Sequence, residues 1–310
     1  WFESCFEKAN LFYRYWLPKG EPKGVVVFMH GVSTHTGKGL IIDGRKLSNL
    51  LLVDSFLEKG LAVYLYEQYG HGFSEGVRTL IPEKYENNKQ DYINFSKMVA
   101  DRHSKDVPFF LAGESYGGTL TIHVAKHFQD HPEDGPSNFD SFLLIAPAVV
   151  ADMPPFPVYQ ILRYILAPYY PNWVPFFMPN PISPERIWRD EAVRKARSEP
   201  RYKEMMIDAG GLPLKLGTAL GIVIAMEEVQ KKAIPGLKMP FCIVHGTGDE
   251  GVLMEGSEYL MKHCATADDL KELHKIDGAM HDILGDPLAE QSMGHLVNFV
   301  ERRLKSFKLQ

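Results

Sequence analysis

The chain has 310 residues, of which 45% are hydrophobic and 24% charged, and its formal net charge is −5. This composition is typical of a globular protein with a sizeable core, built as one large domain or two smaller ones. No apolar run approaches the length of about 20 residues that a membrane-spanning helix needs, so we expect no such helix. There is also no run rich in Lys and Arg, which argues against nucleic-acid binding.

The cysteines and the first residue say little about location. Cys5, Cys242 and Cys264 are odd in number and lack metal-type spacing, which predicts free thiols rather than disulfides or a zinc site. Because the sequence begins with Trp1, we allow for a truncated N-terminal region that carried a tag, signal or anchor. Localisation stays open, with a cytoplasmic protein or one peripheral to a membrane favoured.

In the N-terminal half, short apolar runs alternate with amphipathic segments, the pattern of parallel strands joined by crossover helices. Residues 25–29 form a continuous β-branched and apolar run, as expected of a strand buried on both faces. We predict strands over residues 10–17, 25–29, 61–66 and 142–145, a further strand that runs into residues 113–117, and helices over residues 45–58, around 92–99 and from 116 to 128.

The alternation stops between residues 149 and 221, where prolines and aromatic residues are frequent. The prolines forbid one long helix, so we expect short helices and turns. Strands over 241–244 and 270–276 and helices near 254–263 and at the C-terminus then restore the α/β pattern. We therefore predict a core of residues 1–148 and 222–310 with a cap inserted at 149–221.

The pentapeptide GESYG at residues 113–117 ends an apolar run and is followed at once by a helical pattern. Strand, sharp turn and helix form a nucleophile elbow, in which flanking glycines avoid collisions and leave a serine Oγ exposed. Ser115 is therefore the candidate nucleophile. Because the pattern is common by chance, a base and an acid must also be found.

A serine elbow of this type requires the chain order serine, acid, histidine. Four of the histidines well downstream of Ser115 belong to predicted strands or helices. His245 closes a strand and His274 lies within one, while His263 and His295 lie in helices. His281 follows the last predicted strand on a loop, from which an imidazole can reach the serine. We predict that His281 is the general base.

The acid is expected in the loop HGTGDE at residues 245–250, which closes a predicted strand. Asp249 at its tip would hold the imidazole in one tautomer and stabilise the imidazolium. Glu250 beside it and Asp152 after the preceding strand are alternatives. A purely structural role for Asp249 would be that of an Asx-turn residue.

The tetrahedral intermediate of acyl transfer needs two preorganised N–H donors. One comes from the residue after the nucleophile, which is Tyr116, and the other from the loop after an early strand. That loop opens with HGV at residues 30–32, and we expect the amide of Val32 to be the donor. His30 and Gly31 also form the turn.

The other histidines are given structural roles. His71 lies in the Gly-rich loop at residues 69–76, where we expect a packed, hydrogen-bonded side chain. His123, His127 and His131 recur every fourth residue, and we expect a solvated helix face rather than a metal site. Phosphate-loop and dinucleotide signatures are absent, so we expect no cofactor and no metal ion.

Five sequence blocks in this order resemble the monoacylglycerol lipase and lysophospholipase branch of the α/β-hydrolases. The blocks are HGVSTHTG at 30–37, YGHGFSEG at 69–76, GESYGG at 113–118, HGTGDEGV at 245–252 and GAMHDIL at 278–284. The resemblance implies an α/β-hydrolase fold, a mostly parallel sheet flanked by helices, with a helical cap inserted after the sixth strand.

The resemblance also implies a triad of Ser115, Asp249 and His281 and an oxyanion hole at Val32 and Tyr116. The sequence departs from the branch at Glu67, where Asp is usual, and at Tyr116, where Met is frequent. Neither departure affects the triad. The match is weakest over 149–221, the cap that chooses the substrate in this branch.

An aromatic cap over an exposed serine would line an apolar tunnel that stabilises an acyl chain by about 0.8 kcal/mol per methylene. We therefore expect a serine hydrolase that cleaves fatty-acyl esters of the monoacylglycerol or lysophospholipid type through an acyl-enzyme. We expect no nucleic-acid partner, allow for peripheral membrane contact through the cap, and leave the oligomeric state open.

Four other functions remain alternatives. Acyl transfer to an alcohol and cleavage of small esters would use the same triad. Peptidase activity is also compatible, because triad and oxyanion hole serve amides as well as esters. A catalytically silent ligand-binding relative would lack a triad member, whereas all three residue types are present here.

Overall fold

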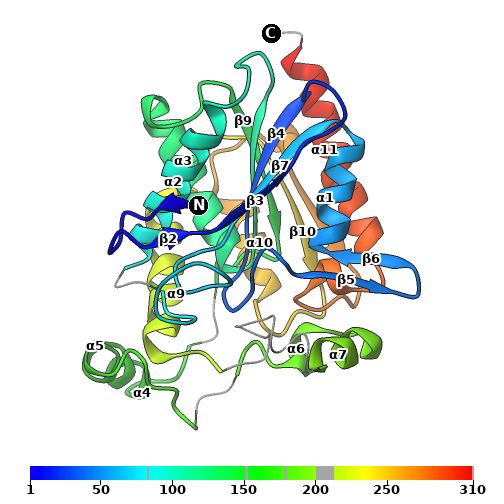
Figure 1. Cartoon of the computed structure of the whole chain (residues 1–310). Coiled ribbons are helices and arrows are strands. Elements are labelled where there is room, and N and C mark those ends of the chain that lie inside the picture. Colours follow the sequence, from blue (N-terminus) through cyan, green and yellow to red (C-terminus); the bar gives the residue numbers. More distant parts are fainter. Residues whose placement is uncertain (82–83, 151–152, 178–179, 200–212, 309–310) are drawn as a thin grey trace.

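The computed structural model describes residues 1–81, 84–150, 153–177, 180–199 and 213–308. At its centre is a seven-stranded sheet in the order β11-β10-β9-β8-β4-β7-β3 (Figure 1). Neighbouring strands are parallel except for β3 and β7, which pair antiparallel. The strands are β3 (Tyr13–Trp16), β4 (Gly24–Met29), β7 (Leu61–Tyr66), β8 (Phe109–Glu114), β9 (Phe139–Ile145), β10 (Phe241–Gly246) and β11 (Lys271–Ile276).

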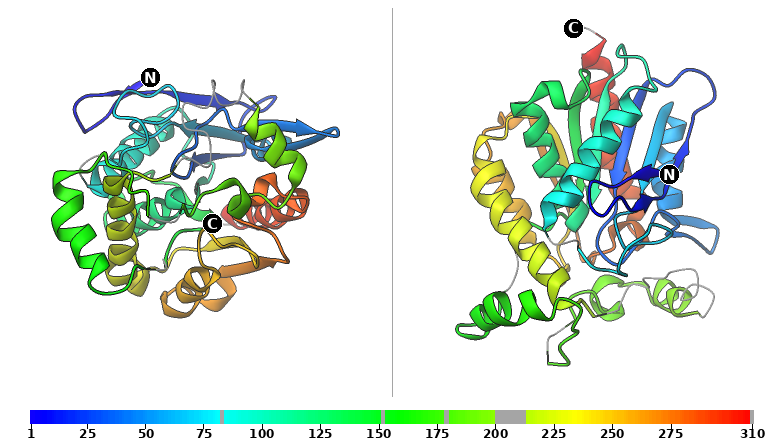
Figure 2. Two further views of the ribbon diagram at one scale, coloured as in Figure 1. Left: turned by 90° about the horizontal axis from the view of Figure 1, so that it is seen from below. Right: turned by 60° about the vertical axis from the view of Figure 1, so that its left-hand side comes forward.

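Helices cover both faces of this sheet, as the views in Figures 1 and 2 show. One face carries α1 (Asn49–Glu58) and α11 (Ala289–Phe307), which also pack against each other. The opposite face carries α2 (Tyr85–Ala100), α3 (Tyr116–Asp130) and α9 (Leu216–Glu228), while α10 (Met254–His263) packs against β10 and β11. The result is a three-layer α/β arrangement.

The two faces of β4 show why its sequence is a continuous apolar run. Successive side chains of a strand point to opposite faces. Val25 and Val27 belong to the apolar cluster on the side of α2 and α3, and Val26 and Phe28 belong to the cluster on the side of α1 and α11. Because helices cover both sides, every residue of β4 is buried, as predicted.

Two predicted boundaries are wrong at the N-terminal end. The strand expected over 10–17 is divided into β2 (Asn10–Leu11), which pairs with β1 (Phe2–Glu3), and β3 of the central sheet. The helix expected over 45–58 begins only at Asn49, and the preceding residues form a hairpin of β5 (Gly39–Ile42) and β6 (Arg45–Ser48).

The turn of that hairpin explains the second error. Asp43 and Gly44 connect the paired residues Ile42 and Arg45, and both have positive φ, 50° and 77°. An Asp-Gly pair with two positive φ values is the preferred two-residue hairpin turn. The dipeptide was therefore a sequence signal for a hairpin that the helical pattern of the following residues obscured.

The predicted cap region, 149–221, contains short helices in the part that the structure describes, and they lie below the sheet in Figure 1. It follows β9, which is the fifth strand of the central sheet in chain order and not the sixth as expected. Its helices are α4 (Val158–Ile161), the π-helical turn Leu162–Leu166, α5 (Ala167–Tyr169), α6 (Pro184–Ile187) and α7 (Glu191–Ser198).

The end of the predicted cap falls inside a helix. α9 begins at Leu216 and continues to Glu228, across the predicted boundary between 221 and 222, and it packs against α2 and α3 of the core. One-turn 3₁₀ or π segments complete the described elements: Pro132–Asp134, Val229–Ala233, Ile234–Gly236, Asp268–Leu270 and Ile283–Gly285. None of the helices in the described residues is both long enough and apolar enough to cross a membrane.

Candidate active site

Ser115 lies at the sharp turn between β8 and α3. Its φ of 57° is in the left-handed region, which only a forced turn imposes on a serine. A Cβ at Gly117 would lie 2.3 Å from the carbonyl oxygen of Met29, and one at Gly113 would lie 2.4 Å from the carbonyl oxygen of Gly117. Only glycine therefore fits at the two positions that flank the elbow.

The structure brings the three predicted site residues together. Ser115 Oγ lies 3.0 Å from His281 Nε2, and His281 Nδ1 lies 2.7 Å from Asp249 Oδ2. Each of the three residues is less than a tenth exposed. This is the geometry that a general base needs to accept a hydroxyl proton, with a carboxylate behind it that fixes the tautomer.

Electrostatics at the site favour a charged pair of His281 and Asp249. Burial by itself lowers the pKa of His281, but the charge of Asp249 and its hydrogen bond outweigh burial, so the pKa is raised above its usual value. Burial would raise the pKa of Asp249, yet the charge of His281 and hydrogen bonds from His245 and His281 hold it well below its usual range. The carboxylate is therefore ionised and ready to stabilise an imidazolium.

Asp249 makes contacts that fit both roles considered for it, the triad acid and the turn residue. Its Oδ1 accepts the backbone N–H groups of Gly251 and Val252 at 2.8 Å each, which is a turn interaction, while Oδ2 faces the imidazole of His281. Glu250 is exposed and lines the adjoining cavity. Asp152, the other alternative acid, lies outside the described residues.

His245 is a site residue that the sequence reasoning missed. Its Nε2 lies 3.2 Å from Asp249 Oδ2, and its Nδ1 lies 2.7 Å from the hydroxyl of Ser257 in α10. The spacing of four residues between His245 and Asp249 is visible in the sequence, but the chain order raises His245 only as a candidate base. Its contact with the acid depends on how the loop after β10 folds back, which the spacing does not reveal.

The loop that carries Val32 is anchored by the loop after β7. Ser33 N donates to His71 Nε2 at 3.1 Å, and Gln68 N donates to His30 Nε2 at 3.1 Å. Burial lowers the pKa of His71 to about 4, so its ring is neutral and accepts this bond. The predicted packed, hydrogen-bonded role of His71 is confirmed.

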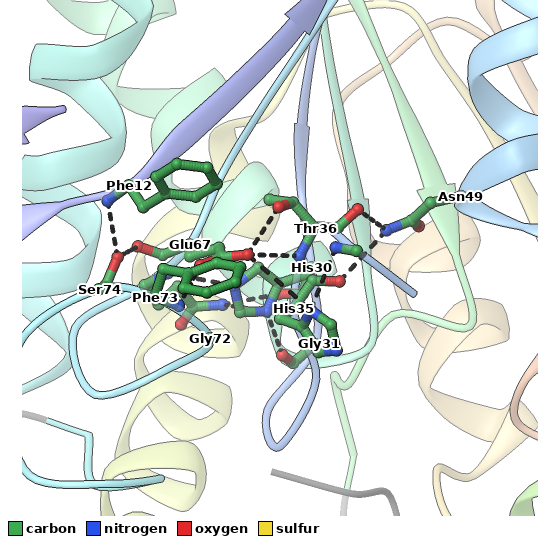
Figure 3. Close-up of polar contacts among 12 residues, drawn as sticks. Phe12, His30, Gly31, His35, Thr36, Asn49, Glu67, Gly72, Phe73 and Ser74 are labelled. Carbon is green, nitrogen blue, oxygen red and sulfur yellow. Dashed lines mark hydrogen bonds and ion pairs between the residues drawn. The ribbon is translucent and has the colours of Figure 1, made fainter. Parts of the chain in front are cut away.

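Glu67 also connects the loop that carries Val32 to the loop after β7 (Figure 3). Its Oε1 accepts the hydroxyl of Thr36 at 2.6 Å and the amide of Thr36 at 3.2 Å, and its Oε2 accepts the amide of Phe73 at 2.5 Å. The hydroxyl of Ser74 donates to the Glu67 carbonyl at 2.6 Å. One fully buried carboxylate thereby ties the loop of Val32 to the loop at residues 69–76.

The proposed oxyanion donors lie beside the serine. Val32 and Tyr116 line the same cavity as Ser115 and His281. Tyr116 is the first residue of α3, and the first N–H groups of a helix have no acceptor within the helix. A Cβ at Gly31 would lie 3.0 Å from that of Ser115, which shows how closely this loop approaches the elbow.

Two cavities of different size meet at Ser115. The larger has a volume of about 560 Å³ and a mainly apolar lining that includes Val150, Leu162, Leu216 and Met226. The smaller has a volume of about 50 Å³ and reaches polar side chains, among them Thr34, Lys38, Glu114 and Asp282. The site can therefore receive a molecule with one long apolar part and one small part that lies near these polar side chains.

The predicted solvated histidine stripe of α3 is wrong at its first position. His123 is 7% exposed, and its Nε2 lies 3.0 Å from the carbonyl oxygen of Ala225 in α9. α9 covers this part of α3, which the periodicity of α3 could not predict. His127 is partly buried beside Asp134, and His131 is exposed.

One group of side chains in the described residues has metal-type donors. Atoms of Cys242, Glu272 and His274 lie within 4.8 Å of one another. Glu272 is already paired with Arg302 and with His274, and burial raises the pKa of the Cys242 thiol far above its usual value. These partners oppose metal binding, and the absence of a cofactor or metal stays a prediction.

The parallel sheet, the serine elbow and the chain order Ser115, Asp249, His281 define an α/β-hydrolase. Residues 20–288 match the model of the family described as Serine aminopeptidase, S33, and the chain belongs to this family. Its similarity to monoglyceride lipases further makes it a monoglyceride lipase-like member and a carboxylic ester hydrolase.

Three comparisons illustrate this similarity. The monoglyceride lipase of Mus musculus is 28% identical over 292 residues, which cover 93% of this chain and 85% of that protein. An uncharacterized abhydrolase domain-containing protein of Dictyostelium discoideum is 25% identical over 302 residues, and the chain spans 29% of its length. The crystal structure of Paleococcus ferrophilus monoacylglycerol lipase has a TM-score of 0.73 at 22% identity and covers 95% of this chain and 99% of that chain.

Proposed function

We propose that the chain hydrolyses monoesters of fatty acids, of the monoacylglycerol or lysophospholipid type, through an acyl-enzyme on Ser115. The observation that carries this proposal is the hydrogen-bonded series Ser115, His281 and Asp249 at the wall of an apolar cavity of about 560 Å³. An acyl chain in that cavity gains about 0.8 kcal/mol per buried methylene.

The proposed reaction has two halves. Ser115 Oγ attacks the ester carbonyl while His281 Nε2 takes its proton, and the N–H groups of Val32 and Tyr116 stabilise the oxyanion. The imidazolium then protonates the leaving alcohol, which leaves the acyl group on Ser115. Water, deprotonated by His281, hydrolyses the acyl-enzyme and releases the fatty acid.

The smaller cavity is the proposed position of the alcohol part. The hydroxyl of Thr34 is buried there and has no hydrogen-bond partner in the described part of the chain. A hydroxyl of the alcohol would supply that partner. Residues 149–221 are proposed to act as the cap, since Tyr159, Leu162 and Leu216 from this region line the apolar cavity.

The mechanism is tested with a fluorophosphonate probe, which labels activated serines. We expect labelling of the wild type and none of Ser115→Ala, with His281→Ala strongly reduced. Equal labelling of the wild type and Ser115→Ala would refute the mechanism.

The substrate class is tested with p-nitrophenyl esters and monoacylglycerols of graded acyl length, together with aminoacyl p-nitroanilides. We expect the highest kcat/KM on medium or long acyl chains. A preference for acetate would indicate a small-ester esterase, and faster anilide cleavage would indicate a peptidase. If added glycerol accepted the acyl group in place of water, the activity would be acyl transfer.

We also propose that the cap contacts a lipid surface. Between residues 153 and 177 the only charged residue is Arg163, and its guanidinium is paired with Glu227. Phe156, Tyr169 and Phe176 in this segment are 80%, 76% and 93% exposed. Apolar and aromatic side chains exposed together favour a membrane interface.

Flotation with phosphatidylcholine vesicles tests the contact. We expect Phe156→Ser combined with Phe176→Ser to reduce the bound fraction, whereas Leu17→Ser, an exposed position at the end of β3, should bind like the wild type. Equal flotation of all three proteins would rule out this surface.

A further inference from the structure

A buried ammonium group lies between the two segments that carry Ser115 and His281. Lys38 Nζ is 3.2 Å from Glu114 Oε1 and 3.1 Å from Asp282 Oδ1. Glu114 directly precedes Ser115 in the chain, and Asp282 directly follows His281. The side chains of Lys38, Glu114 and Asp282 are only 10%, 7% and 3% exposed. One cation thereby joins the chain neighbours of the proposed nucleophile and base.

This group of charges is not explained by stability alone. Each buried ion loses its hydration, and well-packed apolar residues in place of a buried ion pair are often equally stable or more stable. Burial lowers the pKa of Lys38, but the carboxylates of Asp282 and Glu114 outweigh burial and raise it above the usual value. The lysine is therefore charged beside the reacting serine.

Asp282 is held from two further directions. Its Oδ2 accepts the indole N–H of Trp188 at 2.6 Å, and its backbone N–H donates to the carbonyl of Ile187 at 3.0 Å. Burial raises the pKa of Asp282, but the charges of Lys38 and Arg197 outweigh it, so the pKa lies below its usual range. The residue after His281 is thus a fixed anion.

We infer that Lys38 is a positioning residue, which sets the placement of Ser115 against His281 by binding Glu114 and Asp282 together. The inference rests on the proposed function of these two residues. The hydroxyl and the imidazole are 3.0 Å apart, and a displacement of about 1 Å can lower a rate by about 100-fold. Loss of the ammonium leaves two carboxylates close together, and their repulsion separates the two segments.

The charges also act on His281 in opposite directions. Asp249, Glu114 and Lys38 are charged groups near its imidazole, and of these the carboxylates raise the pKa of His281 while Lys38 lowers it. Removal of Lys38 therefore shifts the acid limb of the pH profile to higher pH, and removal of the Glu114 charge shifts it to lower pH. A loss of packing alone would produce neither shift.

The test compares Lys38→Met, Lys38→Arg and Glu114→Gln with a matched control, Lys46→Met. Lys46 forms an ion pair with Asp54 at the surface, where its side chain is 57% exposed. We expect Lys38→Met to lower kcat for a p-nitrophenyl ester by about 10- to 100-fold with little change in KM. Lys38→Arg should recover part of kcat, and Lys46→Met should match the wild type.

The outcomes separate this inference from the proposed function. A wild type without Ser115-dependent probe labelling would refute the function itself. Labelling of the wild type together with unchanged kcat and pH profile in folded Lys38→Met would refute only the positioning role. If Lys38→Met does not fold, Glu114→Gln decides, because it removes one of the two ion pairs of Lys38: a lower kcat with little change in KM supports the inference, and a wild-type kcat overturns it.

Discussion

His245 and His281 share one oxygen of Asp249: their ring nitrogens lie 3.2 and 2.7 Å from Oδ2. His245 Nε2 also lies 3.2 Å from the carbonyl oxygen of Val252, so this nitrogen faces two acceptors and bears the proton. Its Nδ1 then accepts the hydroxyl of Ser257. The acid of the proposed triad is consequently fixed from behind by a second imidazole.

Replacement of this second imidazole should impair catalysis. In His245→Phe a flat ring remains but the donor to Asp249 is lost, and a hydrogen bond to a charged group contributes about 1.5–3 kcal/mol. We expect kcat/KM to fall by about 10-fold or more, measured with a p-nitrophenyl ester. His263→Phe, at the exposed end of α10, is the control. Wild-type kcat/KM in a folded His245→Phe would show that the contact is unimportant.

The pH dependence should report the pairing of His281 with Asp249. Only neutral imidazole accepts the serine proton, and the pKa of His281 is raised because the charge of Asp249 outweighs burial. Labelling by the probe should therefore fall as the pH is lowered, with a midpoint above about 6.5.

In Asp249→Asn the charge that raises this pKa is gone, so burial dominates and the midpoint should move below about 6.5. The rate at neutral pH should also drop, by up to about 10⁴-fold, because the tautomer is no longer fixed. Measurement of the labelling rate between pH 5 and 9 provides both values. An identical midpoint in the two proteins would contradict the proposed pairing.

The elbow should not tolerate a methyl group. In Gly117→Ala the new Cβ would lie 2.3 Å from the carbonyl oxygen of Met29 and 2.5 Å from that of His30, and backbone atoms of a buried strand end cannot move aside. We expect destabilisation by about 1–3 kcal/mol and loss of labelling, measured by denaturant unfolding and the probe.

Gly294 in α11 is the matched control for that substitution, because a Cβ at this position would point into open space among the described residues. Gly294→Ala should stabilise the protein by about 0.5–1 kcal/mol, since alanine is the better helix former. If both variants changed the free energy of unfolding equally, the backbone around Gly117 would have to accommodate the methyl group, and the prediction would be wrong.

A bulky side chain in the apolar cavity should shorten the preferred acyl chain. Ala219 of α9 lines this cavity, and Ala219→Phe would occupy part of its volume. We expect kcat/KM for long-chain esters to decrease while that for a butyrate ester is retained, because each methylene that loses its site forfeits about 0.8 kcal/mol. A parallel decrease for all chain lengths would place the acyl chain elsewhere.

Local patterns were sufficient for the layers of the fold and for the residues that the site brings together. β4 was recognisable because a strand covered on both faces must be apolar throughout, and Ser115 because the elbow restricts its neighbours to glycine. Asp249 and His281 followed from chain order together with their positions in loops that follow predicted strands. The roles of these residues in catalysis remain proposals that the experiments above decide.

Contacts between distant segments could not be predicted in the same way. His123 is buried because α9 covers it, and Lys38 is charged in the interior because two carboxylates from other segments reach it. Neither neighbour is visible in the local sequence. The hairpin at Asp43 and Gly44 differs from these two cases, because the Asp-Gly dipeptide that indicates its turn is visible in the local sequence. The helical pattern of the residues that follow it led to the wrong prediction.

Asp249 accepts four N–H groups, from Gly251 and Val252 at one oxygen and from His281 and His245 at the other. A carboxylate offers about four such positions, so none is left vacant for a proton. When the pH is lowered, His281 is therefore protonated before Asp249, and the hydrogen bonds of Asp249 remain. A short period in mild acid should silence the protein reversibly, and activity should return on neutralisation as fast as the imidazole loses its proton, with no folding step in between.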